Sequence, residues 1–202
     1  MGAVYLLGAG FSRAISGEMP MMNELSAAVQ AIVPDIPGAS TPVSRNFEQW
    51  LSYLVDVPPW PSQGDQLRNQ AAFNDVALAV HHVLDERQTA AVAHGTCPGW
   101  LPKLIRYWQA TDSTVITFNY DLLVELAWSI ELDNGAFQPT RLFPVPLTSI
   151  AARTGAVLGG SPPASGLQLL KLHGSLNWRY SGVDRLSGWL SRGGHSSLIL
   201  PM

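Results

Sequence analysis

Three short segments carry the polar groups best suited to chemistry, and each of them directly follows an apolar run. In chain order they are Gly8-Ala9-Gly10-Phe11-Ser12, Asn119 with Asp121, and His173-Gly174-Ser175. An amide such as that of Asn119 can orient a water molecule or a sugar hydroxyl, and a histidine can act as a general base near neutral pH. Acting together, the three segments could bind a ligand and direct water against it.

The glycine segment offers backbone amides for binding. Glycines at positions 8 and 10, directly after a strand, suit a turn at which the backbone approaches a pyrophosphate, because a Cβ would block that approach. Arg13 stands where the dinucleotide-binding fingerprint has its third glycine. A purely structural turn therefore remains an alternative.

The other polar residues have structural interpretations as well. Asp121 suits the N-cap of the helix that follows it, and for this residue taken alone the cap is the simpler interpretation. A lone histidine between an apolar strand and a glycine is more often structural than catalytic, whereas a buried Asn119 is harder to explain by structure alone. We expect no metal site, because the remaining histidines are not clustered with acidic residues at metal-ligand spacing; they are His81, His82, His94 and His195.

Apolar periodicity predicts the elements that position these segments. Apolar runs predict strands over residues 3–7, 115–117 and 167–172, and helical spacing predicts helices over 22–33, 67–94, 101–108 and from Asp121 to about 130. A further helix is indicated by the apolar stripe Phe47, Trp50, Leu51 and Leu54, with Asn46 and Gln49 as its capping box.

This order of elements favours an α/β fold. We expect a Rossmann-like parallel sheet with a helical insert, about residues 20–110, between its first two strands. Ligands of such sheets bind at the carboxyl ends of the strands. The three polar segments would meet there.

Local patterns add narrower predictions. In the helix over residues 22–33 we expect Leu25, Ala28, Val29 and Ile32 to face inward. Residues 154–166 are rich in glycine, proline and serine, which predicts a mobile loop. The secondary structure of residues 143–150 is ambiguous, and residues 177–180 could form a further strand. Because residues 197–202 form an apolar, strand-like run, we expect the C-terminal part of the sheet to lie beyond Met202.

The composition limits the partners of the chain. Charged residues make up 13% of the 202 residues and the formal net charge is −3, which gives no basic field for nucleic acid or an anionic membrane surface. With 47% apolar residues the surface must be unusually apolar, and we expect a homo-oligomer, a regulatory domain or another subunit to cover part of it. The length suits one domain, residues 1–202, of a longer protein.

The single cysteine, Cys97, rules out an internal disulfide and a cysteine-based zinc cluster, and it fits a reducing compartment. No apolar run reaches the roughly 18 residues of a membrane span. The N-terminus lacks the basic start of a signal peptide. We therefore expect a cytoplasmic protein.

Taken in order, the three segments resemble motifs of the sirtuin superfamily, most closely those of the sirtuin-like domains of prokaryotic antiphage-defence NAD hydrolases. Gly8 to Ser12 is similar to the first NAD-binding loop of the family, with Gly17 and Pro20 where that loop carries its Gly-x-Pro element. Residues 117–121 are similar to the motif that holds the catalytic asparagine, and His173-Gly174 to the catalytic His-Gly pair. Residues 47–54 are similar to the helical insert of the defence branch.

The resemblance implies an NAD+ glycohydrolase that cleaves the bond between nicotinamide and ribose, with NAD as substrate and no metal. It implies an antiviral-defence effector that depletes NAD. Asn119 and His173 would be catalytic, the amides of Gly8 to Ser12 would hold the diphosphate, and Asp121 would hold Asn119 or the nicotinamide carboxamide. The residues implied to bind substrate are Gly8, Ala9, Gly10, Phe11, Ser12, Thr117, Asp121, Gly174 and Ser175.

Three other functions were compared with NAD+ hydrolysis: two fit the residues less well, and one fits them equally well. Deacylase sirtuins carry a four-cysteine zinc module, which the single Cys97 cannot supply. A hydride-transferring dehydrogenase is disfavoured by the missing third glycine and by the helical insert. A non-catalytic module that binds NAD or an ADP-ribose-type signal and gates an attached effector would present the same crevice, and remains the alternative.

Overall fold

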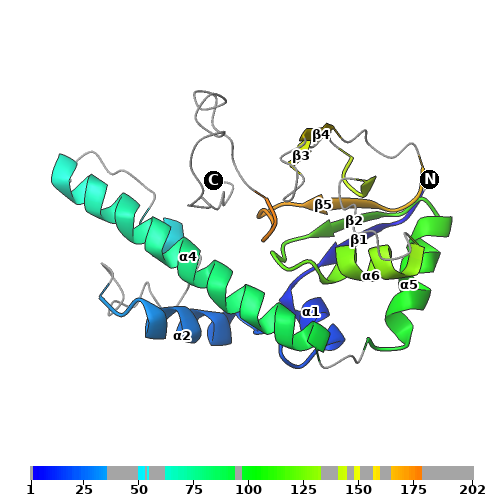
Figure 1. The fold of residues 1–202 in the computed structure, drawn as a ribbon, viewed down its shortest axis with the longest axis horizontal. Coiled ribbons are helices and arrows are strands. Elements are labelled where there is room, and N and C mark those ends of the chain that lie inside the picture. Colours follow the sequence, from blue (N-terminus) through cyan, green and yellow to red (C-terminus); the bar gives the residue numbers. More distant parts are fainter. Residues whose placement is uncertain are drawn as a thin grey trace.

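The computed structural model describes residues 2–35, 50–52, 54, 62–93, 97–132, 141–144, 148–150, 157–159 and 165–178. These residues form a mixed α/β fold in which helices pack beside a three-stranded parallel sheet (Figure 1). The predicted capping box and the apolar run over residues 197–202 lie outside the described residues.

The sheet consists of β1 (Val4–Leu7), β2 (Thr114–Thr117) and β5 (Gln168–Lys171), in the order β1-β2-β5. Both pairings are parallel, as the sequence predicted, and the last residues of the three strands lie level: Leu7, Thr117 and Lys171. The chain therefore leaves all three strands at the same edge of the sheet.

Helices fill the described chain between β1 and β2. They are α1 (Ala9–Ile15), α2 (Met22–Ile32), α4 (Gln63–Ala93) and α5 (Trp100–Ala110), and α6 (Leu123–Leu132) follows β2. Figure 1 shows α2 and the long α4 extending to one side of the sheet, with α5 and α6 next to the strands. In the ranges that the structure describes, no strand interrupts these helices, which agrees with a helical insert.

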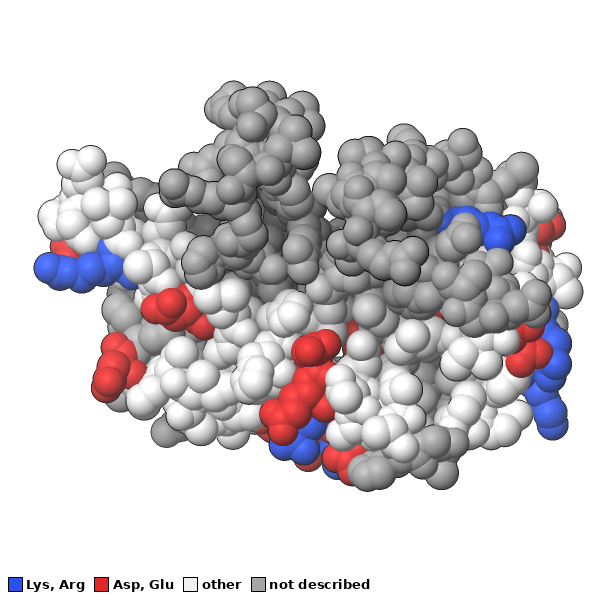
Figure 2. All heavy atoms as spheres, viewed as in Figure 1, with Lys and Arg blue, Asp and Glu red and all other residues white. Residues whose placement is uncertain are grey.

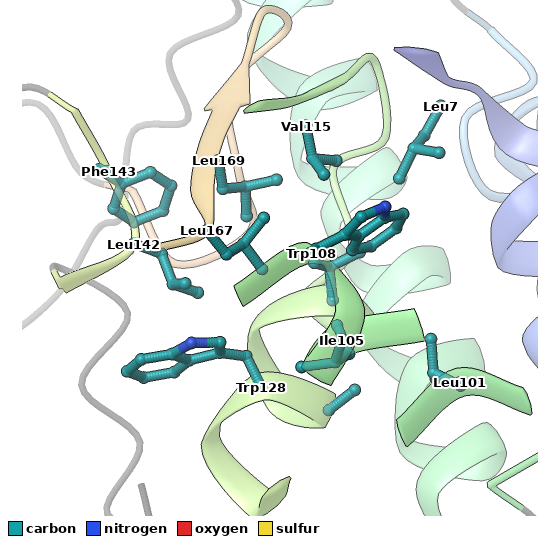
Figure 3. Close-up of a cluster of buried hydrophobic side chains, with 12 residues drawn as sticks. Leu7, Leu101, Ile105, Trp108, Val115, Trp128, Leu142, Phe143, Leu167 and Leu169 are labelled. Atoms are coloured by element: carbon teal, nitrogen blue, oxygen red, sulfur yellow. The ribbon is translucent and has the colours of Figure 1, made fainter. Parts of the chain in front are cut away.

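The main core lies between one face of the sheet and the pair α5 and α6 (Figure 3). Val115, Leu169 and Ile105 are fully buried in it, and Trp108 is 1% exposed. Burial of each such side chain contributes roughly 1.5–3 kcal/mol. Side chains alternate along a strand, so Val4 and Leu6 point to the opposite face, where each is 66% exposed.

A second cluster of buried side chains joins α2 and α4 to Trp50 and Leu54. Leu176 belongs to this cluster, and Tyr120 and Leu122 pack against it. The loops that follow β2 and β5 therefore contact the insert as well as the sheet.

Some local predictions were wrong. Ile32, the last residue of α2, is 47% exposed because it lies outside the packed part of the helix, in which Leu25 and Val29 are buried. The range predicted as a mobile loop contains β4 (Val157–Gly159), which pairs antiparallel with β3 (Thr148–Ile150), since backbone groups can pair whatever the local composition. Residues 177 and 178 belong to a turn in which the Trp178 amide donates to the Ser175 carbonyl, so these two residues form no strand.

Charged side chains are scattered over the face of the molecule in Figure 2 and form no broad field of one sign among the residues that are described there. The described residues also include exposed apolar side chains, the most exposed being Ile130, Val4, Leu6 and Leu67 at 72%, 66%, 66% and 61%. A face of this kind gives no electrostatic attraction for a polyanion.

Candidate functional site

The candidate site lies at the carboxyl edge of the sheet, where three loops begin side by side. Two backbone hydrogen bonds extend the ladder just beyond the strands: the Phe118 amide donates to the Leu7 carbonyl at 3.1 Å, and the Leu172 amide donates to the Thr117 carbonyl at 3.0 Å. The first residues of the loops are therefore held at fixed positions relative to one another. This edge is where ligands of parallel α/β sheets bind.

The side chain of Asn119 reaches across to the loop after β1. Its Nδ2 donates to the Gly8 carbonyl at 2.9 Å and to Ser12 Oγ at 2.7 Å. A carbonyl can only accept, so the bond to Gly8 fixes which end of the amide is the nitrogen. Both hydrogens of Nδ2 are then used, and no hydrogen bond among the described residues uses Oδ1. Asn119 thus offers a fixed acceptor to a ligand or to water.

Ser12 joins Asn119 to Asp121. Its hydroxyl is buried, accepts from Asn119 and donates to Asp121 Oδ2 at 2.6 Å. Asp121 Oδ1 in turn accepts from the amide of Leu123, the first residue of α6, at 3.1 Å. Asp121 therefore accepts from an amide of the first turn of α6, but it lies one residue before the N-cap position, which is Leu122, so the predicted N-cap is displaced by one residue. Its link to Asn119 is indirect, through Ser12, whereas the resemblance implied that Asp121 would hold Asn119 or the nicotinamide carboxamide.

The Thr117 side chain binds the backbone of Asn119. Thr117 is 4% exposed, and its Oγ1 accepts from the Asn119 amide at 3.0 Å. The site asparagine is thus fixed at both its backbone and its side chain. A rigid amide is better suited to orient a reacting group than one that must be ordered on binding.

The glycines of the first loop are not required by the fold. Gly8 has φ −126° and ψ −174°, an extended conformation open to any residue, and a Cβ built at Gly8 or Gly10 would meet nothing within 4 Å. Helix α1 starts at Ala9, so Gly10 lies inside the helix and not in a turn, which corrects the sequence prediction. The absence of side chains here leaves open space around Gly8, whose carbonyl binds Asn119, and around Gly10.

Phe11 does not line this space. Its ring lies 5.7 Å from the ring of Trp100 and 6.0 Å from that of Trp108, so it packs against the main core. Of the predicted binding segment, Gly8 and Ser12 contact Asn119, Gly10 is exposed in α1, and Ala9 is the half-buried first residue of this helix. The segment is therefore divided between core and site.

His173 lies against the two chain neighbours of Asn119. Its ring centroid is 5.0 Å from that of Phe118 and 6.1 Å from that of Tyr120. Gly174 has φ +92°, a conformation that favours glycine and turns the chain away directly after the histidine. Asn119 and His173 thus lie in two neighbouring loops at one edge of the sheet, and no hydrogen bond joins them in the part of the chain that is described.

Ser175 completes the predicted set and is 2% exposed. Its hydroxyl is buried without a hydrogen-bond partner. A buried hydroxyl without a partner is rare and carries a free-energy penalty. The Ser175 hydroxyl is therefore closed off from solvent.

Sequence reasoning missed the buried pair behind the site, Lys171 and Glu125. Lys171 Nζ donates to Glu125 Oε1 at 2.8 Å and to the carbonyls of Tyr120 and Asp121. Burial raises the pKa of the Glu125 carboxyl, and the neighbouring Lys171 opposes that rise. The sequence does contain a signal for this pair, because both charged residues occupy positions that the apolar pattern assigns to the core.

Gln88 was also missed, and it comes from the insert. This residue of α4 is 8% exposed, and its Oε1 accepts from the Leu122 amide at 2.6 Å. The long helix therefore holds the loop that carries Asn119. A glutamine within a helical pattern gives no sequence signal for such a contact.

No group of three or more His, Cys, Asp or Glu side chains in the described ranges could hold a metal ion. The helices in the same ranges include none that is both long and apolar enough to cross a membrane. No family model matches the chain, and no curated protein matches it.

Proposed function

We propose that the chain is the NAD-binding domain of an NAD+ glycohydrolase, with a Rossmann-like sheet and a helical insert, that cleaves the bond between nicotinamide and ribose. One observation carries the proposal: the Gly8 carbonyl and the Ser12 hydroxyl hold the Asn119 amide so that Oδ1 remains as an acceptor. The glycine loop and His173 begin at the same sheet edge. The resemblance of the three motifs to sirtuin-like NAD hydrolases supports the substrate class.

The chemistry needs a water molecule held against an electron-poor sugar carbon. Departure of nicotinamide gives an oxocarbenium-like transition state, and the attacking water must lie on the opposite face of the ribose. Asn119 Oδ1 accepts a hydrogen bond from that water or from a ribose hydroxyl. His173 accepts the proton that the water loses, and the products are nicotinamide, ADP-ribose and a proton.

The substrate is held by loops rather than by charged side chains. The open space beside Gly8 and Gly10 lets the backbone approach the diphosphate of NAD without a Cβ in the way. Phe118, which is 37% exposed, and His173 form an aromatic edge beside Asn119 on which a nicotinamide ring could stack. Thr117, Asp121, Gly174 and Ser175 shape these loops.

The proposed cellular role is that of a cytoplasmic antiviral-defence effector that depletes NAD. The exposed Val4 and Leu6 on the second sheet face support a partner surface, either a second copy or a regulatory domain or subunit. Parallel sheets are normally covered on both faces. The low share of charged residues supports the same proposal.

The test combines a product assay with a binding assay. Purified full-length protein is incubated with NAD, and released nicotinamide is measured by chromatography, while calorimetry measures binding of NAD and of ADP-ribose. The proposal predicts stoichiometric release of nicotinamide and ADP-ribose. Binding of either ligand without any release of nicotinamide would instead identify a non-catalytic module that gates an attached effector.

A further inference from the structure

The buried ammonium of Lys171 connects the two loops that carry Asn119 and His173. Lys171 is the last residue of β5 and stands two positions before His173. Its three donors are used by Glu125 and by the carbonyls of Tyr120 and Asp121, the two residues that follow Asn119. One side chain therefore fixes the Asn119 loop to the strand that delivers the histidine.

A purely stabilising role is a weak explanation of this arrangement. The side chains of Lys171 and Glu125 are each 1% exposed, so both were taken out of water at a large desolvation penalty. Well-packed apolar residues in such places are often equally stable or more stable. Apolar residues, however, could not donate to the carbonyls of Tyr120 and Asp121.

We propose that Lys171 is a positioning residue of the hydrolase: it holds the backbone after Asn119 at a fixed place relative to His173, and Glu125 keeps the ammonium directed at that backbone. This inference rests on the proposed function. A displacement of about 1 Å in a reacting group can lower the rate about 100-fold. Loss of the ammonium should therefore lower turnover more than it weakens substrate binding.

The test replaces the pair by apolar residues of similar size, in the double variant Lys171→Met/Glu125→Leu of the full-length protein. The fold is expected to survive, because both charges are removed together and no unpaired charge stays buried. We expect kcat for nicotinamide release to fall about 10–100-fold, with KM for NAD within about threefold of the unsubstituted protein. Val29→Ala, in the buried cluster of α2 and α4, is the control for lost stability and should leave kcat unchanged.

If the double variant does not fold, Lys171→Met alone serves as the second variant, since its remaining carboxyl can be protonated. A folded variant whose kcat equals that of the unsubstituted protein would overturn the inference. The inference would also be overturned if Val29→Ala lowered kcat by the same factor as the Lys171 variant while lowering the melting temperature by the same amount. Asn119→Asp and His173→Ala are assayed in parallel. If these two lose turnover while the Lys171 variants keep it, only the inference fails; if they keep it, the proposed function fails.

Discussion

The side-chain amide of Asn119 donates to the backbone carbonyl of Gly8 at 2.9 Å, across the junction of two neighbouring strands and a separation of 111 residues in the chain. This bond fixes the orientation of the amide, because the carbonyl accepts and cannot donate. It also joins the glycine loop to the loop of the predicted catalytic residue. The position of one loop therefore depends on the other.

Ser12→Ala should uncouple Asn119 from Asp121. The substitution removes the hydroxyl that accepts from one and donates to the other, and it leaves both groups without that partner in a buried place. We expect the free energy of unfolding to fall by about 1–3 kcal/mol. We also expect kcat for nicotinamide release to fall about 10–100-fold, because the amide gains freedom to rotate.

Ser26→Ala is the matched control for this substitution. Ser26 is a buried serine of α2, and it accepts from Gln30 Nε2 at 3.5 Å, the outer limit of a hydrogen bond. Denaturant unfolding and steady-state kinetics should show little change in either quantity. A Ser12→Ala protein with unchanged kcat would show that the hydroxyl does not position the amide.

Gly10→Ala should separate stability from binding. Gly10 is the second residue of α1 and has open space around it, so alanine should maintain or raise the free energy of unfolding, by up to about 1 kcal/mol. The new methyl group, however, enters the space that the diphosphate would occupy. Calorimetry should therefore show weaker binding of NAD, by about tenfold or more, which corresponds to a loss of about 1.4 kcal/mol or more of binding free energy.

Gly64→Ala gives the comparison at the same helical position. Gly64 is the second residue of α4, and a Cβ there would make an ordinary contact with Ser62 Oγ at 3.7 Å. This variant should gain a similar free energy of unfolding and bind NAD as the unsubstituted protein does. Equal NAD affinities for the two variants would argue against a diphosphate beside Gly10.

The buried carboxyl of Glu125 should make stability depend on pH. Burial raises its pKa in the folded protein above the ordinary value of about 4.3 for glutamate in the unfolded chain. The folded state thus holds the proton more tightly, and the contribution to stability is fully present below about pH 4.3 and is lost as pH rises through the raised pKa.

Urea unfolding at a series of pH values, for the unsubstituted protein and for Glu125→Gln, measures this effect. The variant cannot titrate at this position. The free energy of unfolding of the unsubstituted protein, relative to that of the variant, should decrease as pH rises from about 4 toward neutrality. A difference that stays constant or increases over this range would contradict the raised pKa.

The sequence was sufficient to predict which strand ends meet. Apolar runs ending at Leu7, Thr117 and near Lys171 predicted strands, and the rule that parallel strands share a ligand edge placed their loops together. The spacing of Leu25 and Val29 likewise predicted the buried face of α2, although it extended that face too far, to Ile32.

The contacts that fix the site could not be predicted in the same way. The bond of Ser12 to Asp121 spans 109 residues and that of Lys171 to Glu125 spans 46, and a single sequence does not reveal which distant polar groups meet. The pairing of β3 with β4 was missed for the same reason, since hydrogen bonds between backbones leave little trace in residue type.

The central claim is that Asn119 and His173 act on one NAD molecule, and nicotinamide release by single-residue variants measures it most directly. Asn119→Asp keeps the size of the side chain but sets an oxygen against the Gly8 carbonyl, and His173→Ala removes the proposed base. With melting temperatures close to that of the unsubstituted protein, each variant should release nicotinamide about 10²–10⁴-fold more slowly. Release at the unsubstituted rate by either folded variant would contradict the account.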